Sequence, residues 1–422
     1  MILLYKVLST VLYPLLVLII YIRKFIGKED SMRFKEKIFL SHYNAVEKYN
    51  SKLIWFHAAS IGELRSIIPI IQQLNVEKKN LKFLITTTTL SSGNLAKLEF
   101  KNSNNTYHRF LPLDVPFLME KFLSTWKPDR IFLVDSEIWP NLILKAKKFK
   151  IPIGIINARL TSKSFNKWIM FPNVAKEIFN IFELCICSNM ETKKFLEKLN
   201  AKNIFFIGNI KFIDYKNTKN IENINESFFT TKKFWFAAST HEGEEIFCLK
   251  THLKLKKKFA DIVTIIAPRH IDRTKKIKSL GKKFGLSVQI LNKNQAILEN
   301  KEVVIVNYFG SLDVFFNYAK SVFIGKSMIK RLKKVGGQNP IEAAKLNCKI
   351  YHGPYVYNFE EIYKIFKSNG ISQEIMNFDE LSNNLIIDLE KSNKPNEKIS
   401  EYIKSLGQKI LNDTMVLLDK FI

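Results

Sequence analysis

Cysteine, glycine and proline are scarce in this chain of 422 residues, which contains 4, 15 and 12 of them. So few glycines and prolines exclude a collagen-like or low-complexity chain. The pattern Asp-x-Asp, the commonest metal clamp for nucleotide-diphosphate sugars, occurs nowhere. The cysteines show neither a Cys-x-x-Cys pair nor a framework spacing, which excludes a disulfide-stapled fold. They are Cys185, Cys187, Cys248 and Cys348.

Acidic residues are in the minority, because 39 Asp and Glu face 66 Lys and Arg and leave a formal net charge of +27. A charge of this sign suits three kinds of partner: nucleic acid, an anionic membrane surface or a phosphorylated substrate. A general bias toward lysine is the alternative explanation for part of the excess. Hydrophobic residues make up 46% and charged residues 25%, so the chain folds, and its length predicts two or three domains.

The first 27 residues have the composition of a membrane anchor. Residues 7–22 are apolar apart from small and hydroxylated side chains, and Arg23, Lys24 and Lys28 follow. This run is at the short end of what spans a bilayer core, so the anchor either spans the membrane or lies in its interface. A secretory signal would need a small-residue cleavage site, which is missing, and the basic flank disfavours a buried helix. The positive flank places the following residues on the cytoplasmic side.

Strand-like apolar runs alternate with helical stretches along the rest of the chain. Short runs of this kind indicate parallel sheets covered by helices on both faces. The predicted fold class is α/β, with two doubly wound Rossmann-like domains behind the N-terminal membrane-anchor helix. The predicted strands are residues 53–57, 83–87, 131–135, 153–157, 184–187, 234–238, 262–267, 287–291, 303–306, 321–324 and 349–352.

The domain boundary is predicted near residue 220, where residues 216–230 are polar, rich in asparagine and typical of a linker. We therefore expect an anchor at residues 1–27, a first domain at 28–215, this linker, and a second domain at 231–422. In open α/β sheets, ligands bind beyond the carboxyl ends of the strands. The segments that directly follow predicted strands are therefore the candidate sites.

The segment HAASIGE at residues 57–63 follows the first predicted strand. Its small residues allow a tight turn, and Ser60 can cap the next helix. Glu63 lies three residues after Ser60, at the spacing of a capping box, and this spacing alone favours a capping role. The other interpretation is a general base, because a carboxylate at a helix start in a cleft can take a proton from a substrate.

The segment DSEIWP at residues 135–140 follows the third predicted strand. Its two carboxylates and its tryptophan suit a polar ligand such as a sugar. A solvated loop with Trp139 packed on the core is the alternative interpretation.

The segment ASTHEGEE at residues 238–245 follows the first strand of the second half. Ser239 or Thr240 can cap a helix whose first turn exposes backbone N–H groups to an anion. A zinc site of the His-Glu-x-x-His type would require a second histidine at residue 245, which is glutamate. We therefore discard a metal site here.

The segment APRH at residues 267–270 closes the next predicted strand. Arg269 and His270 together are good partners for a phosphate group, and a surface loop of a basic protein is the alternative. Farther along lies a basic cluster that is by default a solvated face and otherwise faces a phosphate. Its members are Lys330, Arg331, Lys333 and Lys334.

The segment GGQNPIE at residues 336–342 precedes a predicted helix. Gly336 and Gly337 allow close approach of the backbone to a ligand. Either Gln338 or Asn339 can cap the helix, and Glu342 lies one turn in, where a carboxylate can accept ribose hydroxyls.

Taken in order, nine segments resemble the 3-deoxy-D-manno-octulosonic acid (Kdo) transferases of lipid A assembly in Gram-negative bacteria. The resemblance runs from about residue 28 to beyond residue 360 and implies the two-domain glycosyltransferase fold called GT-B. The segments are RFKE from Arg33, HAASIGE, TTTTLSSG from Thr86, SEIWPN from Ser136, NARLTSKS from Asn157, GNIKF from Gly208, ASTHEGEE, APRH and GGQNPIEAA.

The resemblance implies that Glu63 is the catalytic base of an inverting transfer. The donor would be CMP-activated Kdo (CMP-Kdo). The acceptor would be a tetraacylated, bis-phosphorylated disaccharide lipid (lipid IVA) at the cytoplasmic face of the inner membrane. Glu63 would take the proton from an acceptor hydroxyl as it attacks the anomeric carbon, and CMP would leave. A single leaving phosphate needs less charge neutralisation than a diphosphate, so neither a metal nor another cofactor is expected.

The resemblance also assigns the remaining site residues to two groups. On the acceptor side are Ser60, Gly62 and Glu137. The residues expected to bind the donor are Lys211, Ser239, Thr240, Arg269, His270, Gly336, Gly337, Asn339 and Glu342.

Three positions depart from the family pattern and put individual donor contacts in doubt. Gln338 and Tyr355 stand where the family usually has histidine, and Lys326 stands where it has glycine. Two other functions stay open: a GT-B glycosyltransferase that uses a UDP-sugar, and a basic nucleic-acid-binding protein. We expect no nucleic-acid partner, because the sequence has no motif that supports one.

Overall fold

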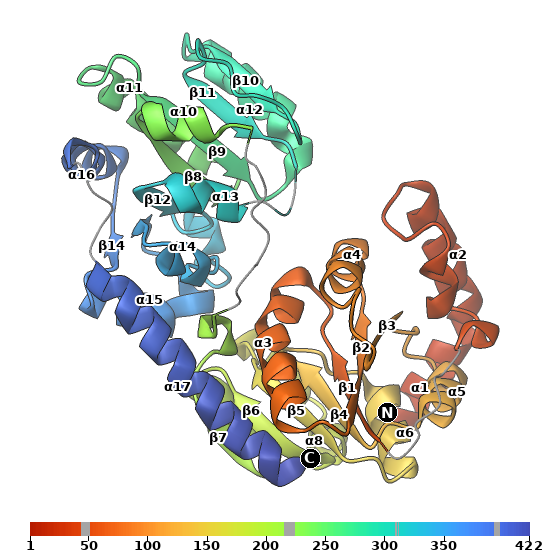
Figure 1. Cartoon of the computed structure of the whole chain (residues 1–422). Coiled ribbons are helices and arrows are strands. Elements are labelled where there is room, and N and C mark those ends of the chain that lie inside the picture. The colour runs from red at the N-terminus through yellow and green to blue at the C-terminus, as the bar shows by residue number, and fades with distance from the viewer. Residues whose placement is uncertain (44–50, 215–223, 309, 311, 392–396) are drawn as a thin grey trace. The chain divides into compact units, whose positions relative to one another are not determined.

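The computed structural model describes the whole chain except residues 44–50, 215–223, 309, 311 and 392–396 (Figure 1). It divides into two compact units. The first comprises Met1–Lys216 and Leu406–Ile422, and the second comprises Asn217–Ser405. Each unit has its own parallel sheet flanked by helices, so the predicted fold of two doubly wound α/β domains is confirmed.

Seven parallel strands form the sheet of the first unit, counted within its described residues. Their order is β3-β2-β1-β4-β5-β6-β7, so the chain runs to one edge, returns to the centre and then runs to the other edge. This is the strand order of the Rossmann fold. The strands are β1(Lys52–His57), β2(Leu81–Thr87), β3(Thr106–Phe110), β4(Arg130–Val134), β5(Ile153–Ala158), β6(Phe182–Cys187) and β7(Ile204–Phe206).

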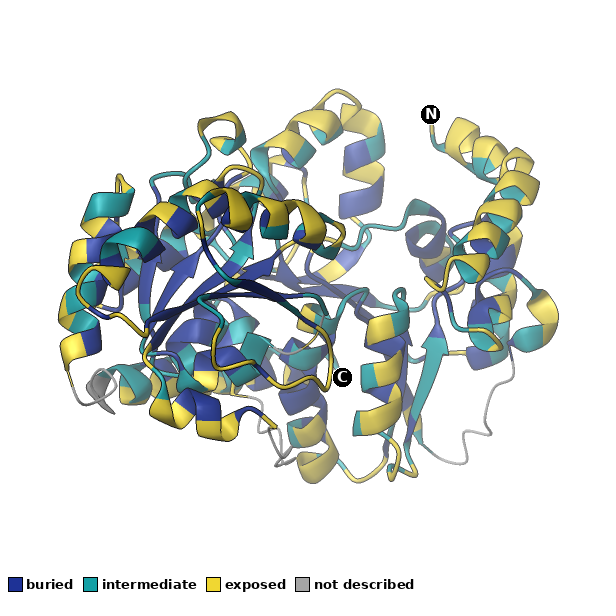
Figure 2. Cartoon of the chain, turned by 90° about the horizontal axis from the view of Figure 1, so that it is seen from above, coloured by how far each residue is buried: buried dark blue, intermediate teal, exposed yellow. Residues whose placement is uncertain are grey.

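Helices cover both faces of this sheet, with buried residues toward the strands and exposed residues outward (Figure 2). Large aromatic side chains fill the core on one face, where Trp55, Phe122 and Trp126 are at most 2% exposed. Proline occupies the first turn of α5, α6 and α8, where its missing N–H costs nothing. The helices are α3(Ile61–Glu77), α4(Leu90–Glu99), α5(Pro116–Trp126), α6(Pro140–Lys148), α7(Ser162–Ile169), α8(Pro172–Phe179) and α9(Met190–Lys198).

The second unit repeats this architecture with the strand order β10-β11-β9-β8-β12-β13-β14. Its strands are β8(Phe234–Thr240), β9(Val263–Pro268), β10(Val288–Leu291), β11(Val303–Val306), β12(Ser321–Ile324), β13(Lys349–His352) and β14(Ser372–Glu374). Its helices are α10(Glu226–Thr231), α11(Glu244–Lys256), α12(Thr274–Lys283), α13(Leu312–Tyr318), α14(Ile341–Lys345), α15(Glu360–Ser368) and α16(Phe378–Glu390).

The last helix, α17(Glu397–Phe421), corrects the predicted end of the second domain, because Leu406–Ile422 belongs to the first unit. Ile410 and Leu418 are at most 2% exposed. The guanidinium Nε of Arg130 donates to the carbonyl oxygen of Phe421 at 2.7 Å. The apolar spacing of a single helix does not reveal which core it covers, so the boundary could not be predicted from the sequence.

The predicted linker, residues 216–230, is also corrected. Residues 215–223 lie outside the described residues, and most of the remainder belongs to α10. The ring of Phe229 lies 5.3 Å from that of Phe234 and stacks on that of Tyr318 at 5.0 Å. These contacts make α10 part of the second core.

The chain begins with two helices, α1(Ile2–Val11) and α2(Tyr13–Phe25), which meet at a bend of 55°. Among the described helices, none is long and apolar enough alone to cross a bilayer, although this bent pair passes on length and composition. The pair rests on the first unit along its length. The hydroxyl of Tyr5 donates to Asp114 at 2.9 Å, and the ring of Tyr21 lies 5.2 Å from that of Phe34.

Substituting Leu418→Ala should destabilise the first unit by about 2–5 kcal/mol, because it leaves a cavity under α17. Val416→Ala on the same helix is the matched control, since Val416 is 57% exposed and its truncation should cost about 0.5 kcal/mol or less. Urea unfolding followed by tryptophan fluorescence measures both. Equal stabilities of the two variants would contradict the docking of α17 on the first core.

Candidate active site

The sheet of the first unit reverses its strand order at its centre, between β1 and β4. In open parallel sheets, ligands bind beyond the carboxyl ends of the strands at this point. The turn after β1 leads to Glu63, and the turn after β4 carries Asp135 and Glu137. The structure brings these carboxylates close enough for the charges of Asp135 and Glu137 to act on Glu63.

Glu63 lies in the first turn of α3 and makes the contacts that its spacing from Ser60 predicts. Its Oε2 accepts the backbone N–H of Ala59 at 2.7 Å, and its Oε1 accepts the hydroxyl of Ser60 at 2.9 Å. Ser60 Oγ in turn accepts the backbone N–H of Glu63 at 3.4 Å. The capping contacts therefore exist, and they hold the carboxylate at the helix start.

Burial raises the pKa of Glu63 above its ordinary value, and the negative charges of Asp135 and Glu137 raise it further. The hydrogen bonds from Ser60 and Ala59 lower the pKa again, without cancelling the rise. A carboxylate whose pKa approaches the working pH is a better proton acceptor. Capping and basicity thus coexist at the same side chain.

Gly62 is exposed, and a Cβ atom built on it would meet nothing within 4 Å. The fold therefore has no packing reason to require glycine here. The open space lies one residue before Glu63, on the same helix turn.

Lys211, predicted to bind the donor, lies in the first unit and pairs with Asp135, with Nζ 2.5 Å from Oδ2. The side-chain amide of Asn157 donates to the other oxygen of Asp135, and its own Oδ1 accepts the backbone N–H of Ile210 at 3.0 Å. Asp135 and Asn157 both have left-handed backbone conformations, with φ of 59° and 58°. Such strained positions cluster at functional sites.

Glu137 accepts the indole N–H of Trp139 at 2.9 Å. The buried imidazole of His57 also approaches it, with Nε2 3.4 Å from Oε2. His57, Asp135 and Asn157 each stand in or begin a segment that the sequence singled out, but none of them was assigned an individual role. Their positions could have indicated a role, since each is the last residue of a predicted strand. A strand is predicted from its apolar residues, however, and this pattern gives no information about the polar residue at its end.

In the second unit, the predicted donor residues gather at the carboxyl end of β8, directly after β9, and beside β12. Ser239 has a φ of 57°, and Thr240 donates its hydroxyl to Glu245 at 3.0 Å. Arg269 and His270 are exposed after β9, and the N–H of Arg269 donates to Thr240 O at 3.0 Å. The strand order places β8 between β9 and β12, so these segments share one edge.

A buried carboxylate organises the turn after β12. Glu244 accepts the backbone N–H groups of Lys326, Ser327 and Met328 at 2.7–3.0 Å, and that of His241 at 2.8 Å. Burial raises the pKa of Glu244, and these four N–H groups oppose the rise. Glu245, the next residue, forms a bidentate ion pair with Arg273. Glu244 and Glu245 therefore both have structural roles.

The paired glycines lie directly beside this turn. A Cβ at Gly336 would come within 2.2 Å of Tyr355 O, and Gly337, with a φ of 85°, donates its N–H to Lys326 O at 2.8 Å. Lys326 itself has a φ of 60°, a conformation that glycine adopts freely. The glycine that the family resemblance predicts at this position would adopt the same backbone conformation without strain.

The structure also locates the rest of this segment. Asn339 Oδ1 accepts the N–H of Ile341 at 3.2 Å, as a cap does. Glu342 is half-buried in α14. The carbonyl oxygen of Gln338 accepts the hydroxyl of Tyr363 at 3.1 Å, a contact that its side chain does not determine.

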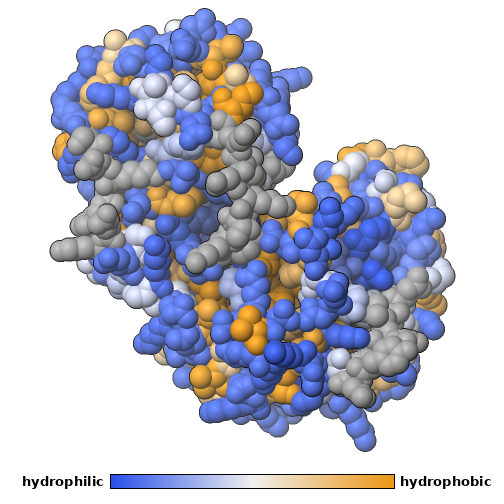
Figure 3. Space-filling model, viewed as in Figure 1, coloured by the Kyte–Doolittle hydropathy of each residue, from blue (hydrophilic) through white to orange (hydrophobic). Residues whose placement is uncertain are grey.

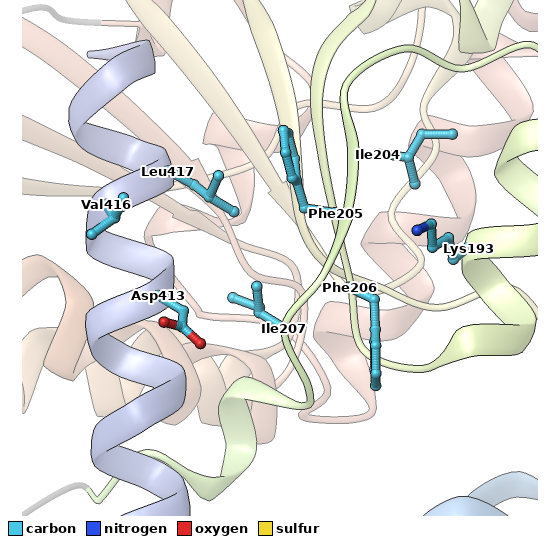
Figure 4. Close-up of a pocket in the computed structure, with 8 residues that line it drawn as sticks. All are labelled: Lys193, Ile204, Phe205, Phe206, Ile207, Asp413, Val416 and Leu417. Atoms are coloured by element: carbon cyan, nitrogen blue, oxygen red, sulfur yellow. The ribbon is translucent and has the colours of Figure 1, made fainter.

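The first unit contains a pocket of about 380 Å³ (Figure 4). It lies between α9, the edge strand β7 and α17. Its lining residues are Lys193, Ile204, Phe205, Phe206, Ile207, Asp413, Val416 and Leu417. None of the predicted site residues belongs to it.

Two doubly wound units with polar residues at the strand ends define the GT-B fold. The solved UDP-GlcNAc 2-epimerase of Neisseria meningitidis, bound to UDP-GlcNAc, matches 87% of this chain and 98% of its own. The TM-score is 0.58 at 14% sequence identity, which is a likeness of fold alone.

The sequence comparisons identify the family. The family profile described as 3-Deoxy-D-manno-octulosonic-acid transferase (kdotransferase) matches residues 32–213. A probable mitochondrial 3-deoxy-D-manno-octulosonic acid transferase of Arabidopsis thaliana is 33% identical over 373 residues, covering 86% of this chain and 81% of that relative. The 3-deoxy-D-manno-octulosonic acid transferase of Rickettsia prowazekii (strain Madrid E) is 30% identical over the full length of both chains. The chain belongs to the 3-deoxy-D-manno-octulosonic acid transferase family of glycosyltransferases.

The raised pKa of Glu63 makes the stability of the first unit depend on pH in a predictable direction. Below the pKa of the unfolded chain, Glu63 is protonated in both states; as the pH rises through the folded pKa, ionisation costs the folded state stability. Glutamine at residue 63 cannot titrate and avoids this cost. The melting temperature of Glu63→Gln minus that of the unsubstituted protein should therefore be larger at pH 8 than at pH 4.

The matched control is Glu380→Gln, because Glu380 caps α16 in the same way, accepting from Met376 N at 2.7 Å and from the Asn377 side chain at 3.2 Å. Thermal denaturation across this pH range measures both variants. A melting-temperature difference for Glu63→Gln that stays constant with pH, or that reverses sign, would contradict the raised pKa.

Proposed function

We propose that the chain transfers Kdo from CMP-Kdo to lipid IVA, with inversion at the anomeric carbon. The observation that carries the proposal is the carboxylate of Glu63, which lies at the central switch point of the first sheet with a raised pKa. A general base at this place can act on the hydroxyl of an acceptor sugar. Membership of the Kdo transferase family supports Kdo as the group that is transferred.

The proposed reaction is a single displacement. An acceptor hydroxyl gives its proton to Glu63 while its oxygen forms a bond with the anomeric carbon of Kdo. The bond from that carbon to the phosphate oxygen breaks, and CMP leaves with the electron pair. The open space at Gly62 supports an approach of the acceptor beside Glu63, and Ser60 and Glu137 complete the acceptor side.

We assign nucleotide binding to the second unit. Arg269 and His270 are exposed beyond β9 and suit the single phosphate of CMP. The turn that carries Gly336 and Gly337 lets the backbone approach the ligand, and Ser239, Thr240, Asn339 and Glu342 complete the donor set. We propose no metal and no cofactor, because one phosphate carries little charge to neutralise. Lys211 pairs with Asp135, so its predicted donor contact would require that it exchange partners.

The decisive experiment incubates the protein with CMP-Kdo, generated in situ, and lipid IVA. The product mass reports transfer and the number of Kdo residues added, and competition by CMP against UDP identifies the donor nucleotide. Glu63→Gln should lower kcat about 10²- to 10⁴-fold while CMP binding stays near normal, because the substitution removes the basic oxygen. The capping contacts can persist, since the amide oxygen accepts the N–H of Ala59 and the amide nitrogen can donate to Ser60 Oγ.

Glu380→Gln should transfer at the normal rate. Normal turnover by Glu63→Gln would remove the base assignment. Inhibition by UDP with indifference to CMP would instead favour a UDP-sugar donor.

We further propose that α1 and α2 lie in the interface of the cytoplasmic face of the inner membrane. Contacts along both helices hold them on the first unit, and their other side is exposed (Figure 2). The face of the molecule in Figure 3 is predominantly hydrophilic, whereas this helix pair concentrates exposed apolar residues. They include Leu3, Leu4, Val7, Leu8, Val11, Leu12, Leu15, Leu18, Ile19 and Ile22. Lys24 and Lys28 follow and suit anionic lipid.

The double variant Leu15→Glu with Leu18→Glu should lose vesicle binding by tenfold or more, because burying each leucine in lipid contributes about 1.5–3 kcal/mol. Flotation with vesicles of zwitterionic and anionic lipid measures the bound fraction. The control is Val76→Glu with Leu98→Glu, at positions that are 74% and 57% exposed in the same unit. Equal flotation of both double variants would rule out the helix pair as the anchor.

A further inference from the structure

The last residue of β1, His57, is completely buried, and its imidazole lies between Thr86 and Glu137. Its Nδ1 is 2.9 Å from Thr86 Oγ1, and its Nε2 is 3.4 Å from Glu137 Oε2. Within the described residues, Nε2 has no partner at hydrogen-bonding geometry. A buried polar nitrogen without a partner is costly, so it calls for an explanation.

The proton on this ring can be placed by following the hydrogen bonds behind it. The indole N–H of Trp55, which can only donate, points at Thr86 Oγ1 at 2.8 Å. Thr86 Oγ1 therefore accepts this bond, and its own proton is available to His57 Nδ1. The carbonyl oxygen of Thr86, a poorer partner of Nδ1 at 3.2 Å, already accepts the N–H of Ala58 at 3.0 Å. With Nδ1 as the acceptor, the ring proton of the neutral imidazole lies on Nε2.

We propose that His57 is a positioning residue that donates its Nε2–H to the carboxylate of Glu137. Together with the indole N–H of Trp139, which donates to the same Oε2 at 2.9 Å, it fixes the orientation of Glu137 on the acceptor side. The chain of donors runs from Trp55 through Thr86 and His57 to Glu137. With Nε2 and Oε2 3.4 Å apart, the hydrogen bond requires only a small adjustment of the two side chains. Catalytic hydrogen bonds are often long or poorly aligned in ligand-free structures. The inference rests on the proposed function for its effect on transfer, though not for the position of the proton.

The second unit contains a matched control. His252 is equally buried, and its Nδ1 lies 2.9 Å from Thr264 Oγ1. Its Nε2 is 4.0 Å from Glu302, a residue that belongs to neither group of site residues. Substitutions at His252 therefore report the structural cost of losing a buried histidine–threonine pair.

The kinetic test compares two amides at residue 57, each of which replaces one ring nitrogen. The amide nitrogen of glutamine falls near the position of Nε2, and that of asparagine falls near Nδ1. His57→Gln should stay within about fivefold of normal kcat/KM for the lipid acceptor. His57→Asn should lose about 10- to 100-fold, because Glu137 is then misplaced. His252→Asn should transfer normally.

A double-mutant cycle with Glu137→Gln tests whether His57 acts through Glu137. His57→Asn should add less than about twofold to the loss caused by Glu137→Gln, because residues that act as one unit are not additive. Equal losses for His57→Gln and His57→Asn, or full additivity with Glu137→Gln, would overturn the positioning role.

The position of the proton is measured without the reaction, by ¹⁵N spectra of protein labelled at its 7 histidines. The signals of His57 are those that vanish in His57→Gln. They should report a proton on Nε2 and move when Thr86→Val removes the hydroxyl. A proton on Nδ1 alone overturns the inference even if transfer is observed. If the unsubstituted protein transfers no Kdo, the proposed function fails, and these spectra still decide the hydrogen bond.

Discussion

All strands of each sheet run parallel, so every strand delivers its last residue to the same edge. The interior strands are buried on both faces and consist mainly of apolar residues, which leaves their ends as the place where polar groups meet. In the first unit this geometry collects Glu63, Asp135 and Glu137 at the reversal between β1 and β4. No local sequence pattern joins Glu63 to Asp135 and Glu137, because Glu63 follows β1 and the other two carboxylates follow β4.

Three carboxylates at one site repel one another, and each has its own compensation. Lys211 and Asn157 bind Asp135, Trp139 binds Glu137, and the helix start binds Glu63. The left-handed backbones of Asp135 and Asn157 add strain of roughly 1–2 kcal/mol each. The deeply buried strands on either side hold these conformations in place. A site of this kind is stable only because its framework is rigid.

The same framework explains what could be predicted from the sequence. Interior strands are apolar runs and were predicted, whereas β3, β7 and β14 were missed, and each lies at the edge of a sheet. An edge strand contacts one neighbour and buries less, so β7 has two exposed residues among its three. The position of α17 depends on a core distant in sequence, which periodicity does not encode. The spacing of Glu63 from Ser60 predicted its capping contacts, which the structure shows, whereas its role as a base stays a prediction. The spacing alone could not separate the two roles, because the capping contacts and the raised pKa occur at the same side chain.

The two units offer an internal comparison that separates these roles. Each has an acidic residue in the first turn of the helix after its first strand, Glu63 in α3 and Glu244 in α11. A carboxylate has about four acceptor sites. Glu244 is fully buried and accepts four backbone N–H groups, so it has no site left for a substrate proton. Glu63 accepts two hydrogen bonds, one on each oxygen, and keeps acceptor capacity at the edge where the strand order reverses. Because all its acceptor sites are occupied, the carboxylate of Glu244 serves only to stabilise the fold. The carboxylate of Glu63 has free acceptor sites, which a base requires.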